Sequence, residues 1–222
     1  MSVADPKTSQ RDALIMAALP HVAFDGWSRK TLTAAAEAQG VNYDHLFPGG
    51  PKQAVAHFMD LADRKMIEDL AALDLASMKV RARVTAGVKV RLERWTPHRE
   101  AVRRALALAP LPPFAGESLR GFYRTVDASW RAAGDRATDF NFYTKRGLLA
   151  AVYGSTVLFW LDDRSEGCVA TWAFLDRRIA EVMQFPQWKA KVTERLKILP
   201  DPRRALERFA ERFGPKTRRP AS

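Results

Sequence analysis

Hydrophobic residues in this chain recur at three- and four-residue intervals along almost its whole length. Alternation of β-branched residues, the signature of strands, is hard to find anywhere. One clear stripe between residues 51 and 70 consists of Val55, Phe58, Met59, Ala62, Met66 and Leu70. The sequence therefore predicts an all-α protein.

Proline and glycine divide this pattern into separate helices. After a first helix that starts at Ser9 or Gln10 and ends at Val22, we expect helices over 29–39, 42–46, 51–70, 78–95, 98–108, 118–132, 138–161, 165–184, 186–198 and 202–213. Ser28 is a candidate N-cap for the second of them. Residues 109–116 hold three prolines within four residues, so we expect a loop there.

The charge of the chain is strongly positive and unevenly distributed. The 222 residues carry a formal net charge of +11, and such an excess attracts nucleic acid or an anionic membrane surface. Counted by segment, the net charge is −1 for residues 1–60, +5 for 61–185 and +7 for 186–222. We therefore predict a division of the chain into these three segments.

Residue patterns for catalysis or cofactor binding are missing. The single cysteine, Cys168, excludes a multi-cysteine metal site. The four histidines stand at none of the spacings that place two metal ligands on one helical face, and neither phosphate-binding glycine loops nor a G-x-S-x-G motif occurs. We predict no catalytic residue, no metal and no cofactor, hence a protein that is not an enzyme.

The apolar stretches of the chain are short. The longest, residues 148–161, is shorter than a membrane-spanning helix and is bracketed by charged residues. The first ten residues lack the apolar region of a signal peptide. A cytoplasmic bacterial protein is the simplest interpretation.

The three short helices at the N-terminus, followed by a larger helical body, have the order of a helix-turn-helix regulator of TetR type. Residues 42–46 occupy the position of the recognition helix. They offer Asn42, Tyr43, Asp44 and His45 but no fixed cation for phosphate contacts. We predict a degenerate helix-turn-helix that binds no specific nucleic acid, with a TetR-family repressor that holds a hydrophobic ligand as the alternative.

Several strings resemble a known family over about residues 9–184. They are HVAFDGWS, LFPGG, VDASWRAAGD, TDFNFYTKRGLLAAVYGST and TWAFLDRRI, and the stretch 126–179 is the specific part. These residues resemble the coenzyme Q (ubiquinone) biosynthesis accessory family, here called Coq-nine. The resemblance implies a TetR-like helical bundle, an isoprenoid or phospholipid ligand, and presentation of a quinone precursor to the membrane-associated di-iron hydroxylase of ubiquinone synthesis.

The resemblance also implies a partner interface. Family members usually have Trp-Tyr before Ala-Gly-Asp in a surface patch that meets the hydroxylase. Here Arg131 follows Trp130, so half of the aromatic pair is changed. We predict a partner interface of Trp130, Arg131 and Asp135.

Residues 138–161 have apolar side chains around nearly the whole circumference of the expected helix. The sequence alone favours a buried core helix over a helix that lines a lipid cavity, whereas the resemblance favours the cavity. The predicted lipid-binding residues are Phe142, Leu148, Val152, Tyr153, Thr156 and Trp160.

The 202–213 stretch predicts a basic amphipathic helix. Its predicted membrane-contact residues are Leu206, Phe209, Phe213, Arg204 and Arg208, and the alternative is that the apolar ones pack onto the body. The three segments then become a degenerate helix-turn-helix, a lipid-binding and dimerisation body, and a basic amphipathic C-terminal segment. We expect a homodimer, peripherally associated with the bacterial inner membrane through its anionic surface.

Overall fold

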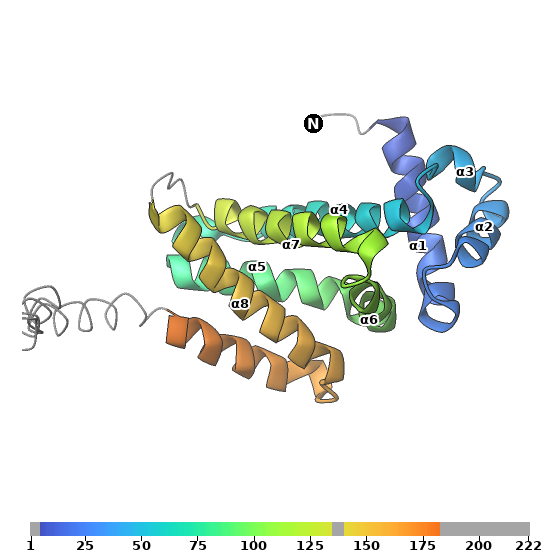
Figure 1. Cartoon of the computed structure of the whole chain (residues 1–222). Coiled ribbons are helices and arrows are strands. Elements are labelled where there is room, and N and C mark those ends of the chain that lie inside the picture. The colour runs from blue at the N-terminus through green and yellow to red at the C-terminus, as the bar shows by residue number, and fades with distance from the viewer. Residues whose placement is uncertain (1–4, 135–139, 183–222) are drawn as a thin grey trace, which may run out of the picture. The chain divides into compact units, whose positions relative to one another are not determined.

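The computed structural model describes residues 5–134 and 140–182, with the side chains of 140–145 left out (Figure 1). These residues form helices and no strands, which confirms the all-α prediction. The α-helices are α1 (Pro6–Asp25), α2 (Arg29–Ala38), α3 (Tyr43–Leu46), α4 (Gly50–Ala71), α5 (Val80–Trp95), α6 (Arg99–Leu108), α7 (Pro112–Ala132) and α8 (Phe140–Asp162), followed by a helix over 169–182. Short 3-10 turns lie at Leu75–Ser77, Thr96–His98 and Glu166–Cys168.

Polar caps define the starts of the short N-terminal helices. The Ser28 hydroxyl accepts a 3.1 Å hydrogen bond from the Thr31 amide, which confirms the predicted cap of α2. Asn42 does the same for α3, where its side-chain oxygen accepts from the His45 amide at 2.9 Å. These bonds satisfy amides that have no partner inside the helix. They set the residues at which α2 and α3 begin.

The loop expected over residues 109–116 is wrong in its second half, because α7 begins at Pro112. Pro112 and Pro113 occupy the first turn, where the amide hydrogen that proline lacks would have no acceptor in the helix. Only Pro110 lies outside the helix. The first helix is also longer than expected, since it begins at Pro6 and ends at Asp25.

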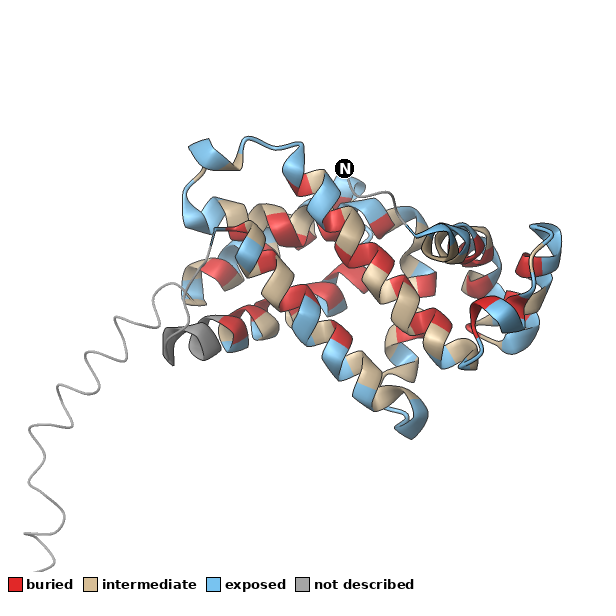
Figure 2. Cartoon of the chain, turned by 90° about the horizontal axis from the view of Figure 1, so that it is seen from above, coloured by how far each residue is buried: buried red, intermediate tan, exposed pale blue. Residues whose placement is uncertain are grey.

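The body is built from long helices that lie side by side. α4 packs against both α5 and α7, while α8 contacts α5, α6 and α7 and crosses them obliquely (Figure 1). Figure 2 shows the buried residues along the faces where these helices meet. An aromatic chain runs through this core, with ring centroids of Phe58 5.2 Å from Trp27 and 5.0 Å from Trp95.

Side-chain hydrogen bonds attach the N-terminal helices to the body. The Trp27 indole donates to the Ala101 carbonyl at 3.0 Å, and Arg104 donates to the Ala23 carbonyl at 3.0 Å. Residues 1–179 form one compact unit. The predicted segment boundary at residue 60 falls within α4, and the division into three functional segments stays a prediction.

Candidate functional site: an apolar cavity in the helical body

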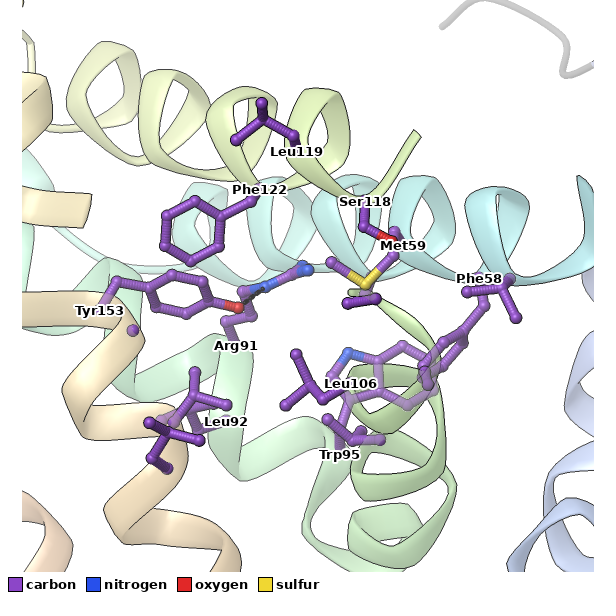
Figure 3. Close-up of a pocket in the computed structure, with 18 of the residues that line it drawn as sticks. Phe58, Met59, Arg91, Leu92, Trp95, Leu106, Ser118, Leu119, Phe122 and Tyr153 are labelled. Atoms are coloured by element: carbon purple, nitrogen blue, oxygen red, sulfur yellow. Dashed lines mark hydrogen bonds between the residues drawn. The ribbon is translucent and has the colours of Figure 1, made fainter. Parts of the chain in front are cut away.

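Five helices of the body, α4 to α8, enclose a cavity of about 490 Å³ (Figure 3). This volume is within the range of small-molecule sites. The wall is mostly hydrocarbon, with aliphatic side chains from every helix. Its aromatic members are Phe58, Trp95, Phe122, Tyr153 and Trp160.

Gly154 on α8 lies beside the aromatic part of the cavity wall. A Cβ added at Gly154 would lie 3.5 Å from the Phe122 ring, an ordinary van der Waals distance, so the ring lies directly beside this glycine. The Phe122 and Tyr153 rings then pack with centroids 5.5 Å apart. The Phe122 ring therefore fills part of the space beside Gly154 on α8.

The predicted lipid-binding residues occupy different places. Tyr153 and Trp160 line the cavity. Val152 and Thr156 are buried and Leu148 is half-buried, but none of these three is part of the cavity wall. The Phe142 side chain is outside the described residues.

The sequence analysis did not predict the parts of the cavity wall that α4 to α7 contribute. One of these wall residues could have been noticed from its position in the sequence. Arg91 occupies the buried face of α5, in register with Val84, Val88 and Trp95. A charged residue on an apolar stripe is rare unless it is paired. The sequence could have marked Arg91 as a buried polar position, although not its partner.

The partner of Arg91 is Asp63 on α4, and both residues are only 4% exposed. The Arg91 Nη1 atom lies 2.8 Å from the Asp63 carboxylate, and Arg91 Nε donates to the Tyr153 hydroxyl oxygen at 2.8 Å. Thr125 donates to Asp63 at 2.7 Å and Arg124 contacts the other carboxylate oxygen at 3.2 Å. Arg91 is therefore a charged residue of a mostly apolar wall, and its carboxylate partner lies behind the wall.

Two leucines of the wall are exposed to solvent. Leu119 on α7 is 72% exposed and Leu158 on α8 is 65% exposed. Large apolar side chains exposed beside a cavity are typical of a mouth through which an apolar molecule passes. The cavity thus has an exposed apolar edge to which α7 and α8 contribute.

The helix-turn-helix pair presents little free positive charge. Asp44, in the middle of the four-residue α3, forms an ion pair with Arg29 at the start of α2. This pair neutralises a cation near the recognition position, in agreement with the acidic balance of residues 1–60. That the chain binds no specific nucleic acid stays a prediction.

The predicted partner patch lies at the end of α7. Trp130 is half-buried, while Arg131 is exposed and its Nε lies 2.7 Å from Asp127 on the same helix. The second carboxylate oxygen of Asp127 accepts a hydrogen bond from Arg146 Nε on α8, also at 2.7 Å. Asp135 is outside the described residues.

The predicted membrane-contact residues, Leu206, Phe209, Phe213, Arg204 and Arg208, also lie outside the described residues. Among the described helices, none has the length and hydropathy needed to cross a membrane. In the same part of the chain, acidic, histidine and cysteine side chains form no group of three or more suited to a metal ion.

Comparison with known proteins places this architecture in a class. A TetR transcriptional regulator from Nitrosomonas europaea superposes with a TM-score of 0.65 at 20% identity, covering 79% of this chain and 98% of the regulator. The all-α fold is therefore TetR-like. At this identity the likeness concerns the fold alone.

Sequence comparisons then identify related proteins. The COQ9 family model matches residues 115–186. The chain is 33% identical over 190 residues to the mitochondrial ubiquinone biosynthesis protein COQ9 of Drosophila melanogaster, covering 81% of this chain and 58% of that protein. Human COQ9 is 30% identical over 179 residues, covering 77% of this chain and 56% of that protein.

The resemblance to the Coq-nine family is thereby confirmed, and the chain is a homologue of the COQ9 proteins. It spans less than two thirds of the length of these relatives.

Proposed function

We propose that this protein is a non-enzymatic accessory protein of ubiquinone biosynthesis. It binds an isoprenoid lipid in the α4–α8 cavity and presents a quinone precursor to the di-iron hydroxylase at the membrane. The observation that carries the proposal is the apolar cavity of about 490 Å³ with exposed leucines at its mouth. The names of the curated relatives supply the pathway.

The mouth supports binding of a chain-like ligand. A cavity of this volume holds a head group and part of a tail, and the open side between Leu119 and Leu158 lets the rest of a long tail continue outward. An apolar tail transferred from a membrane into this wall is stabilised by about 0.8 kcal/mol for each buried methylene group.

Mass spectrometry of lipid extracted from the purified protein tests the proposal directly. We expect an isoprenoid lipid in the parent protein and less of it in a Gly154→Leu variant, whose new side chain enters the wall beside Phe122. Gly116→Leu is the matched control, because a Cβ at Gly116 meets nothing within 4 Å. Extracts of the parent without any isoprenoid would contradict lipid binding.

The partner proposal assigns Trp130, Arg131 and Asp135 to contact with the hydroxylase. Trp130→Ala should weaken co-purification with the hydroxylase, since aromatic interface anchors contribute about 2 kcal/mol or more. The melting temperature should change little, because Trp130 is half-buried at the end of α7.

The buried Trp27 provides the comparison, since its truncation should remove about 3–5 kcal/mol of folding stability. If Trp130→Ala destabilises the fold as much as Trp27→Ala does, Trp130 is a packing residue and not a partner contact.

For the membrane, we propose peripheral association of a cytoplasmic bacterial protein through Leu206, Phe209, Phe213, Arg204 and Arg208. Near an anionic surface, each basic residue contributes about 1 kcal/mol. Phe209→Glu with Phe213→Glu should reduce flotation with liposomes that contain anionic lipid. Equal flotation of the folded double variant and the parent would exclude this contact.

A further inference from the structure

An arginine of α5 binds the backbone at the C-terminal end of α7. The guanidinium Nη1 of Arg83 donates a hydrogen bond to the Ala133 carbonyl at 3.3 Å, directly after the last residue of α7. Its Nε donates to the Met78 carbonyl at 2.9 Å, and its Nη2 donates to the Ala76 carbonyl at 3.3 Å. Arg83 therefore connects the end of α7 to the chain that leads into α5.

The end of a helix is a favourable place for this side chain. The last carbonyl groups of a helix have no amide donor within the helix, and they carry the negative end of the helix dipole. A guanidinium group supplies both a donor and a positive charge, and hydrogen bonds from charged donors are stronger than those from neutral ones. Arg83 thus caps α7 from a neighbouring helix.

Gly134 leaves room for this contact. Its φ is +87°, in the left-handed region that favours glycine. A Cβ at this position would lie 3.0 Å from Arg83 Nη1, which is closer than most Cβ contacts. The glycine therefore lets the chain turn away from α7 while the guanidinium group stays at the Ala133 carbonyl.

The last turns of α7 are also attached on the α8 side. Both α5 and α8 lie beside α7 in the body (Figure 1). Arg146 of α8 is only 4% exposed, and its Nε lies 2.7 Å from Asp127 of α7. Arginines of two neighbouring helices thus fix the C-terminal end of α7.

Two of the residues proposed to contact the hydroxylase lie in this fixed part of α7. Trp130 and Arg131 are within one helical turn of Ala133. A surface that is ordered before a partner arrives loses less conformational entropy on binding. A frayed helix end would instead present these side chains in many orientations, and binding would have to select one of them.

We propose that Arg83 is a positioning residue for the partner surface, because it fixes the last turn of α7 through the Ala133 carbonyl and so orients Trp130 and Arg131. The inference rests on the proposed function and adds to it a residue of another helix. Arg83 acts through the backbone of α7 and not through contact with the partner. Gly134 and Arg83 act together as one clamp.

The test measures equilibrium binding of the full chain to the purified hydroxylase. Arg83→Met keeps the aliphatic part of the side chain and removes the guanidinium group. We expect about threefold to tenfold weaker binding, since the freed side chains must be ordered again on association. Arg81→Met is the matched control, because it removes the same charge from α5, where Arg81 donates only to the Asp176 carbonyl. It should bind like the parent.

Hydrogen exchange gives a local measurement that does not need the partner. The Ala133 and Gly134 amides donate to the carbonyls of Ser129 at 3.1 Å and Arg131 at 2.9 Å. In Arg83→Met these two amides should exchange about threefold to tenfold faster, the effect of losing one hydrogen bond at the helix end. Unchanged exchange at both amides would show that Arg83 does not fix this turn.

Gly134→Ala is a second and independent variant. Its methyl group displaces Arg83 Nη1 and strains the backbone, so it should also weaken binding to the hydroxylase. Combined with Arg83→Met, the loss should be smaller than the product of the two single losses, because both changes break the same contact. Where Arg83→Met does not fold, parental binding by Gly134→Ala overturns the inference by itself.

The remaining outcomes separate this inference from the proposed function. If Arg83→Met binds the hydroxylase like the parent, or if Arg81→Met weakens binding as much as Arg83→Met does, the positioning role is overturned while the proposed partner stands. Losses that multiply in the double variant overturn the clamp of Arg83 and Gly134. If the parent does not bind the hydroxylase, the proposed partner and the positioning role fail together.

Discussion

Replacing Arg91 by methionine should lower the free energy of unfolding by about 3–5 kcal/mol, since it removes the buried partner of the Asp63 carboxylate and leaves only the half-exposed Arg124 as a cation. Asp63 is only 4% exposed, so water cannot replace the lost guanidinium group. Arg124 balances the carboxylate only in part, because its side chain is half-exposed and also lies 3.9 Å from Asp60. Urea unfolding followed by far-ultraviolet circular dichroism measures the difference.

Arg94→Met is the matched control on the same helix. Arg94 also binds a carboxylate of α4, with Nε 2.7 Å from Asp69, but this pair is partly exposed to solvent. Exposed pairs contribute about 0–1 kcal/mol, so this variant should lose at most that much. Similar losses in the two variants would contradict the special cost assigned to the buried pair.

A double variant tests whether the loss of stability comes from the buried charge of Asp63 or from the lost packing of Arg91. Asp63→Asn combined with Arg91→Met removes both charges and keeps an acceptor for the Thr125 hydroxyl. Because the penalty comes from the unpaired charge, the double variant should be more stable than Arg91→Met alone. A double variant that is less stable than the single one would show that the arginine stabilises the fold through packing.

The helices were predictable from the sequence because each depends on local patterns. The stripe of α4 and the caps at Ser28 and Asn42 act within a few residues of the chain. The start of α7 was misjudged because proline breaks a helix only beyond its first turn, and the sequence does not show where that turn begins. Local patterns therefore gave the elements but missed both ends of α1 and the start of α7.

The cavity was predictable only on the α8 side. Tyr153 and Trp160 were identified because their helix is apolar around its circumference and because of the family resemblance. The other walls come from four further helices, and no local spacing states how far apart those helices pack. The pairing of Arg91 with Asp63, 28 positions earlier in the sequence, is a contact of this non-local kind.

The second large effect is expected at Asp163, which joins the end of α8 to the helix over 169–182. Its carboxylate accepts four hydrogen bonds, two from the amide and hydroxyl of Ser165 at 2.8 and 2.6 Å and two from those of Thr171 at 2.9 and 2.5 Å. Asparagine at this position has one acceptor oxygen, and its amide group would face hydrogen-bond donors. Asp163→Asn should therefore lower the free energy of unfolding by about 2–3 kcal/mol at neutral pH.

The effect of Asp163→Asn should depend on pH with a defined sign. Burial raises the pKa of Asp163, but the hydrogen bonds from Ser165 and Thr171 outweigh it and hold the pKa well below its ordinary value. A carboxyl group with a lowered pKa in the folded state stabilises the fold above its unfolded pKa, about 3.9, and loses that contribution as the pH falls toward the folded value. The difference between parent and variant should thus be constant from pH 7 to about pH 5 and shrink below about pH 4.

A variant of the neighbouring Asp162 distinguishes the loss of these four hydrogen bonds from the loss of a negative charge alone. Asp162 is exposed and lies 2.9 Å from Arg103, so Asp162→Asn removes the same charge one residue away without disturbing the four bonds. Its loss should stay below about 1 kcal/mol. If the two variants unfold at the same urea concentration at pH 7, the four hydrogen bonds of Asp163 do not stabilise the connection between α8 and the helix that follows it.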